Sequence, residues 1–200
     1  MPEHEKRELS ELHDQEARLA LFSFNSSTVW ELGSTLRALA LKEYPDQPAL
    51  ISITHSSGTP LFLAHTIEAI SPAYAAEAEA VRNSVRRYEI SSWRRQRLLT
   101  LGERPNEYER AEREAKAGEF SLKGGGWAVR VKGVVGLVAV VVVTGLYSRT
   151  GTGGKGQGSF NPLKYDRPTD ANHEVVVKAL ELVLDKQYVR LRIFWCMSRG

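Results

Sequence analysis

The chain has 200 residues, 42% of them hydrophobic and 26% charged, which is enough for one domain with its own core but short for two full domains. Its 27 basic and 24 acidic residues give a formal net charge of +3, and this even balance does not favour nucleic acid as a partner. Cys196 is the one cysteine, so an intrachain disulfide is excluded, which fits a reducing compartment. The charged segment from Met1 to Glu16 contains no secretory signal, and we expect a cytoplasmic protein.

Two helices are predicted in the N-terminal quarter of the chain. Leucines at helical spacing among charged residues indicate a first helix from Glu5 to Leu21. Ser26 or Ser27 would cap a second helix that runs to about Tyr44. Pro45 then ends the pattern. The apolar residues of this second helix are expected to pack against a sheet; they are Val29, Trp30, Leu32, Leu36, Leu39 and Ala40.

A hairpin and a long helix follow. Ala49 to Ile53 and Pro60 to His65 are predicted as two strands, because the serine- and glycine-containing segment between them is typical of a turn. Pro72 suits the first turn of a long helix that continues to about Arg87. Ser91 to Leu101 is expected to be helical or irregular.

A charged helix from Glu107 to Lys116 is expected to be exposed, and two strands come after it. Trp127 to Lys132 and Val134 to Thr144 would form these strands, turning near Gly133. The second is apolar on both faces, which predicts a central strand covered on both sides. The most apolar stretch, Val134 to Leu146, is shorter than the roughly 20 apolar residues of a membrane span. No membrane association is therefore expected.

The last part of the chain combines a long loop, a helix and a tail. Residues 147–170 are expected to be a glycine-rich insertion, followed by a helix that Asp170 or Asn172 caps and that continues to about Lys186. Tyr188 to Met197 would be a final strand or an oligomer contact. The predicted organisation is an N-terminal helix (1–21), one domain (22–187) and a C-terminal tail (188–200). Helices and strands do not alternate regularly, so an α+β fold with an antiparallel sheet is expected.

Several short motifs occur in an order that resembles one family. They are Phe22-Ser23-Phe24 with Val29 to Gly33, Ala49 to Ile53 with Gly58 to Phe62, Arg82 to Tyr88 with Ser91-Ser92, Gly125 to Trp127 with Gly133 to Gly136, Val143 to Leu146, and Asn172 to Val176. Their order and spacing resemble the haem-degrading-domain (GlcG/HbpS-like) family, in particular its small branch of bacterial and fungal proteins. The resemblance implies a profilin-like antiparallel sheet of about five strands flanked by helices, and a tendency to form homo-oligomers. Some relatives bind haem or iron.

The chain also departs from the pattern of that branch. The long helix of the branch usually carries a tryptophan followed by an Arg-Lys pair, and here the corresponding stretch is Glu77 to Val81. The proline expected after Trp127 is Ala128, and the insertion after Leu146 is longer than expected. A shared function that needs the tryptophan and the Arg-Lys pair would therefore be lost or altered in this chain.

The histidines are the main candidates for chemistry. His173 lies in a motif of the family, where it would cap a helix or hydrogen-bond a loop, or else serve as an axial haem ligand or an acid/base group. His55 and His65 are weaker candidates for a metal site, because their spacing matches no known ligand pattern. The sequence identifies no catalytic residue.

Arginines, serines and an aromatic residue complete the candidate ligand-binding set. Arg86 and Arg87 would bind an anion or a haem propionate, or form an exposed face paired with nearby glutamates. Ser91, Ser92 and Trp127 belong to motifs of the family, although paired serines commonly cap helices. The glycines after Tyr147 fit the pattern G-x-G-x-x-G, but no helix begins there, so a flexible loop or a lid is expected in place of a dinucleotide site.

Three functions remain open on this basis. The first is an oligomeric intracellular protein that binds a small ligand such as haem without catalysis. The second is a non-catalytic oligomeric adaptor, and the third is an enzyme acting on a small organic substrate with His173 as acid/base. Haem is the cofactor that the resemblance implies.

Overall fold

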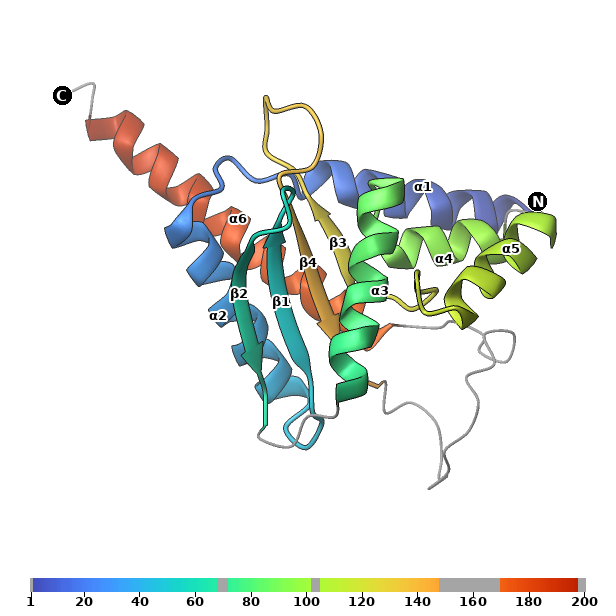
Figure 1. Cartoon of the computed structure of the whole chain (residues 1–200). Helices are drawn as coiled ribbons and strands as arrows, with labels where there is room; N and C mark the ends of the chain where they lie inside the picture. The colour runs from blue at the N-terminus through green and yellow to red at the C-terminus, as the bar shows by residue number, and fades with distance from the viewer. Residues whose placement is uncertain (1, 68–71, 102–104, 148–169, 198–200) are drawn as a thin grey trace.

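A computed structural model describes residues 2–67, 72–101, 105–147 and 170–197. The described strands form one antiparallel sheet in the order β2-β1-β4-β3, with helices on both faces (Figure 1). The strands are β1 (Leu50–His55), β2 (Pro60–His65), β3 (Gly126–Val129) and β4 (Ala139–Thr144). The α+β prediction is therefore confirmed, with four described strands where about five were expected.

The centre of the sheet is β4, which pairs with β1 on one side and with β3 on the other. All six of its residues are buried, because its run of valines packs against helices on both faces. The prediction of a central strand covered on both sides is confirmed. The strand is shorter than predicted, because Gly133 and Gly136 adopt positive φ in the connection before it.

One face of the sheet packs against α2 (Ser26–Glu43) and α6 (Ala171–Met197). Leu32 and Leu36 of α2 meet Leu180 of α6 in the same buried cluster as Ile51 of β1. The helix α2 begins as predicted, but its cap is Asn25, whose Oδ1 accepts the Thr28 N–H at 3.0 Å.

The other face packs against α3 (Pro72–Tyr88), where Val81 and Val85 share a buried cluster with valines of β4 and with Leu50 at the start of β1. Next to α3 lie α4 (Ser92–Leu101) and α5 (Pro105–Lys116), and α1 (Glu3–Arg18) packs along α4. Two ion pairs, from Arg94 to Glu16 at 2.8 Å and from Arg97 to Glu8 at 2.5 Å, join α1 to α4. The region from Ser91 to Leu101, left open between helix and irregular structure, is thus mainly helical.

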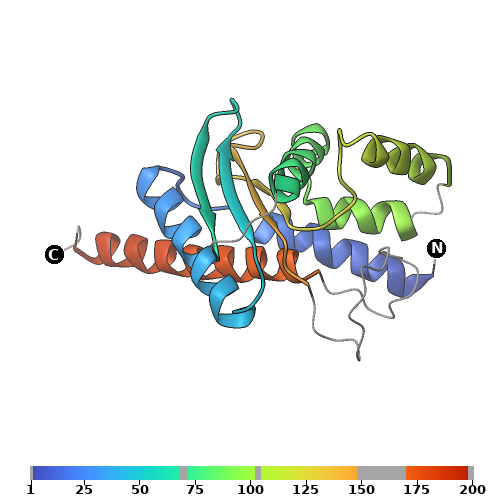
Figure 2. The ribbon, with the colours of Figure 1, turned by 60° about the horizontal axis from the view of Figure 1, so that its bottom comes forward.

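The helix α6 is longer than the sequence indicated. It continues to Met197, so the predicted final strand over Tyr188 to Met197 is wrong, and the boundary drawn between residues 187 and 188 falls inside a helix. Figures 1 and 2 show its C-terminal end extending beyond the sheet and the other helices. Within the described part of the chain, no helix has the length and apolarity that a membrane crossing requires. Most of the predicted glycine-rich insertion, at 148–169, lies outside the described residues.

Candidate ligand-binding site

An apolar groove of about 510 Å³ lies where the first turn of α2 meets the β1–β2 turn and the β3–β4 connection. Its walls come from three stretches of chain that are far apart in the sequence, at 24–30, 55–62 and 131–138. Most of the lining side chains are apolar, among them Val29, Phe62, Val134 and Val138. A concave, largely apolar surface with few polar groups is typical of a small-molecule site.

Two aromatic rings form one wall of the groove. Trp30 and Phe62 lie edge to face with ring centroids 6.0 Å apart, and Trp30 is 70% exposed. The ring of Phe62 lies directly over Gly33, where an added Cβ would come within 2.5 Å of the ring. The glycine of the Leu-Gly motif therefore lets this ring lie against α2. Trp30, predicted to pack against the sheet, contacts it only at the edge, through Phe62 of β2, and most of its side chain is exposed.

His55 ends β1 and is the histidine that lines this groove in the described structure. Its Nδ1 lies 2.8 Å from the Ser57 hydroxyl oxygen and 3.2 Å from the Ser57 backbone nitrogen. Because the Ser57 backbone N–H can only donate, Nδ1 accepts in this geometry and the proton of a neutral ring lies on Nε2. Nε2 offers a lone pair to a ligand once that proton moves to Nδ1, where the Ser57 hydroxyl can accept it. Arg86 fixes the backbone at this point, since its Nη2 donates to the His55 carbonyl oxygen at 3.3 Å.

A second, polar pocket of about 670 Å³ adjoins the groove. It lies between the exposed face of α2 and the middle of α6, and it shares Ser26 and Trp30 with the groove. The lining is rich in hydroxyl groups and contains three charged side chains, those of Glu31, Lys186 and Arg190. The two cavities therefore adjoin around Trp30, one lined mostly by apolar residues and the other mostly by hydroxyl-bearing and charged residues.

His173 occupies a different place, in the first turn of α6 and outside both cavities. Its ring packs between Trp127 and Trp93, with centroid distances of 5.7 and 6.1 Å, and its Nε2 lies 3.2 Å from the Gln15 side-chain oxygen. Only 6% of the residue is exposed, and this burial lowers the pKa of His173 to about 3. The imidazole is therefore neutral near pH 7 and holds α1, α4 and α6 together.

Asp170 caps α6. The His173 side chain, for which a capping role was one of the predictions, does not. The Oδ1 of Asp170 accepts the backbone N–H groups of Asn172 at 2.9 Å and His173 at 3.1 Å. Burial raises the pKa of Asp170, and these N–H donors oppose that rise. Of the two caps predicted from sequence, Asp170 is the one observed. Asn172 bonds instead to the backbone of Leu146.

The remaining predicted ligand residues are dispersed over the fold. Arg87 lies 3.7 Å from Glu114 and over the ring of Phe120, facing α5. Ser91 caps α4 through the Arg94 N–H, and Ser92 accepts the N–H of Gly126 at 2.9 Å. The structure brings Trp127 and His173 together and places Ser92 beside them through Gly126, whereas Arg86 bonds to His55 and Arg87 faces α5.

The histidines of the hairpin do not form a metal site together. The register pairs Leu50 with His65, so His65 lies at the opposite end of the hairpin from His55. Across the described ranges, no three histidine, cysteine, aspartate or glutamate side chains are grouped to hold a metal ion.

Sequence reasoning missed Phe62, Lys186 and Arg190 as cavity residues. The available signal was a tryptophan in a helix turn whose neighbours are Ser26, Ser27 and Glu31, because an aromatic side chain among polar ones often marks a binding surface. Nothing in the sequence connected that turn to residues at 186–190, which are more than 150 positions away.

A family model described as "Haem degrading protein HbpS-like" matches residues 24–150, more than half of the chain. The chain belongs to the HbpS-like family. The resemblance inferred from the motifs is confirmed. Members of the UPF0303 group are similar over most of their length. The protein of Acidobacterium capsulatum is 29% identical, covering 90% of this chain and 91% of its own. That of Rhizobium etli is 27% identical, covering 93% and 95%.

Several solved structures share the fold. The Ybr137w protein matches with a TM-score of 0.68 and 18% identity, covering 88% of this chain and 87% of its own. A double mutant of Streptomyces reticuli HbpS matches with a TM-score of 0.51 and 14% identity, covering 80% and 86%. A PduOC:haem complex matches with a TM-score of 0.50 and 14% identity, covering 83% and 94%.

Proposed function

We propose that this HbpS-like protein binds haem, or a flat apolar molecule of similar size, in the groove between α2 and the two turns, where His55 would hold the iron. The observation that carries the proposal is an apolar groove of about 510 Å³ with His55 on its wall. The description of the family and the haem complex of a protein with the same fold support this choice of ligand.

The residues of the groove fit the requirements of a haem. A macrocycle needs apolar and aromatic surfaces on its faces, which Trp30, Phe62 and Val29 provide. Its iron needs a neutral imidazole nitrogen, which Nε2 of His55 would supply when the ring proton moves to Nδ1 and bonds to the Ser57 hydroxyl in place of the present bond from the Ser57 backbone N–H. Bound haem would supply an iron centre for ligand exchange or electron transfer.

His173 is less suited to that task. Its ring is enclosed by two tryptophans and borders neither cavity, so a macrocycle reaches it only if these side chains move. The low pKa that burial imposes on His173 also argues against the acid/base role of the enzyme alternative, because a general base works best with a pKa near the operating pH.

The test is a titration with haemin followed by absorbance in the Soret region. The native chain should shift the Soret band and saturate, and His55→Ala should weaken binding at least about tenfold, which corresponds to about 1.4 kcal/mol. His65→Ala is the matched control, because it removes a histidine from the other end of the same hairpin. A free-haemin spectrum at high concentrations of the native chain would contradict the proposal, and so would equal binding by His55→Ala.

We also propose that the chain associates with copies of itself through the projecting end of α6. Val189, Leu191 and Ile193 of this end are each about half exposed, although they are large apolar side chains. Large apolar groups gathered on one exposed helix favour a protein–protein contact. This proposal concerns assembly and is independent of haem.

A further inference from the structure

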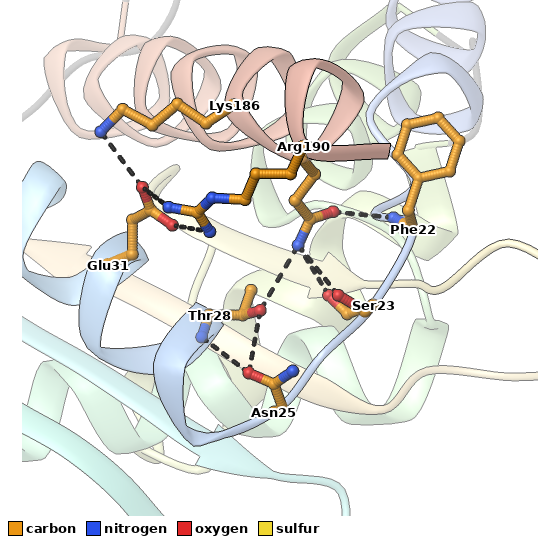
Figure 3. Close-up of polar contacts among 8 residues, drawn as sticks. Phe22, Ser23, Asn25, Thr28, Glu31, Lys186 and Arg190 are labelled. Carbon is orange, nitrogen blue, oxygen red and sulfur yellow. Dashed lines mark hydrogen bonds and ion pairs between the residues drawn. The ribbon is translucent and has the colours of Figure 1, made fainter. Parts of the chain in front are cut away.

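The polar pocket beside Trp30 contains a cluster of three charged side chains: Glu31 of α2, and Lys186 and Arg190 of α6. Arg190 donates two hydrogen bonds to the Glu31 carboxylate, from Nη1 to Oε2 at 3.0 Å and from Nη2 to Oε1 at 3.3 Å. The Nζ of Lys186 lies 3.2 Å from Oε1 of the same carboxylate. Figure 3 shows Glu31 of α2 between the two basic side chains of α6. Two positive charges thus face one negative charge, and the cluster has a net charge of about +1.

The cluster has capacity for a further anion. A guanidinium has five N–H donors and an ammonium has three, and the bonds to Glu31 use two of the first and one of the second. Partial burial would raise the pKa of Glu31, but hydrogen bonds from Lys186 and Arg190 outweigh it and hold that pKa below its ordinary value. Glu31 therefore stays ionised and positions both cations. Lys186 and Arg190 themselves are more than half exposed, so an incoming group can reach them.

A buried glutamine fixes the helix turn that carries these cations. Gln187 is 5% exposed, and its Oε1 accepts the Phe22 N–H at 2.9 Å. Its Nε2 donates to the Ser23 carbonyl oxygen at 2.9 Å and lies 3.4 Å from the Thr28 hydroxyl. A side-chain amide with both ends bonded holds α6 in one rotation and height against the segment before α2. Lys186 and Arg190, on either side of Gln187, are thereby placed in advance in the polar pocket beside Trp30.

We infer that the ligand of this protein is an amphiphilic anion, whose apolar body lies in the groove and whose carboxylate binds Lys186 and Arg190 across Trp30. This rests on the function proposed above and adds the polar half of the site. The groove and the pocket share Trp30 and Ser26, so one molecule can occupy both. Arginine and lysine together suit a carboxylate, and the hydroxyl groups of Ser27, Ser34 and Thr35 would solvate it.

The experiment compares haemin with haemin dimethyl ester, which has the same apolar body but no carboxylates. The native chain should bind haemin about tenfold more tightly than the diester, and added salt should reduce that preference because it screens exposed charges. The double variant Lys186→Gln/Arg190→Gln should bind haemin and the diester equally, with the affinity that the native chain has for the diester. Lys178→Gln is the matched control, since Lys178 also joins α6 to α2, through Glu43 at 2.7 Å, but lies outside both cavities.

A second variant tests the inference in the opposite direction without removing a cation. Glu31→Gln leaves Lys186 and Arg190 in place and raises the local charge, so it should bind haemin several-fold more tightly and the diester unchanged. Equal affinity of the native chain for haemin and diester would overturn the inference, as would a preference that survives in the double variant. If both compounds bind equally but require His55, the function proposed above stands and only the carboxylate site fails. If neither binds, both fail.

Discussion

His173 is buried between two tryptophans, whereas His55 borders a cavity, and this difference decides what each imidazole can do. A histidine side chain free in water titrates near pH 6.5. Burial lowers the pKa of His173 to about 3, because the charged form loses its hydration without gaining an acidic partner. His173 therefore acts as a neutral packing group that carries one hydrogen bond, to Gln15. The presence of a histidine in a family motif does not by itself identify a ligand.

The low pKa of His173 makes stability depend on pH. Between about pH 6.5 and pH 3 the unfolded chain protonates this imidazole and the folded chain does not, so stability from this group is complete above pH 6.5 and falls as the pH decreases. Each pH unit in that window costs about 1.4 kcal/mol. Between pH 7 and pH 4.5, native protein should therefore lose about 2–3 kcal/mol more unfolding free energy than His173→Gln. Urea unfolding at both pH values measures this, and equal losses would contradict it.

Three consecutive glycines at the start of β3 each lie unusually close to a different neighbouring element. Gly124 lies against Asp170, the cap of α6, and Gly126 lies against Val81 and Val85 of α3. Gly125 has φ +95°, and a Cβ there would collide with the Val143 carbonyl oxygen in β4. In the sequence, this run of glycines indicates only an interruption of secondary structure. In the fold, it is the place where the sheet approaches α3 and α6 closely.

Gly125→Ala should lower the free energy of unfolding by about 2–4 kcal/mol, because it adds both backbone strain and a collision with the central strand. Gly118→Ala is the matched control. Gly118 also has positive φ, at +78°, but a Cβ there meets nothing within 4 Å, so its cost should be only about 1 kcal/mol. Denaturant melts of both variants give the comparison. A Gly125→Ala protein as stable as Gly118→Ala would show that the turn adjusts freely.

At the scale of the whole molecule, the candidate site exists only because four distant stretches of chain converge. The first turn of α2 meets the β1–β2 turn and the β3–β4 connection at the groove, and α6 closes the adjoining polar pocket. The end of α6 then continues past all of these elements (Figure 1). The protein therefore presents a cavity and an apolar projection on the same helix, and the two uses can be separated by mutation.

Self-association through α6 should depend on its projecting apolar residues. The double variant Leu191→Asp/Ile193→Asp adds charge to a surface that must lose water on contact, so it should shift the mass measured by light scattering from oligomer to monomer. Haemin binding should be unchanged, because neither residue lines the cavities. A native chain that is monomeric at all concentrations would contradict the proposal. Arg192→Gln, on the same projecting turn, controls for a general loss of charge.

Much of the secondary structure could be predicted from the sequence, because it follows from local patterns. The hairpin of β1 and β2, the doubly covered strand β4 and the start of α3 at Pro72 all follow from alternation, β-branched runs and turn residues. The predicted end of α6 was wrong because that prediction also relied on local patterns. Aromatic and β-branched residues from Tyr188 onward are typical of a strand, but the helix that Gln187 bonds to Phe22 continues through them. Tertiary packing overrode the local propensity.

The sequence by itself determined the α+β class, the family and most helix and strand positions, since these depend on residues near one another in the chain. Only the tertiary structure decided which histidine is buried and which borders a cavity, because burial is set by elements that meet across the fold. It likewise brought Lys186 and Arg190 beside Glu31 and Trp30, a juxtaposition of helices far apart in the chain that no local pattern encodes.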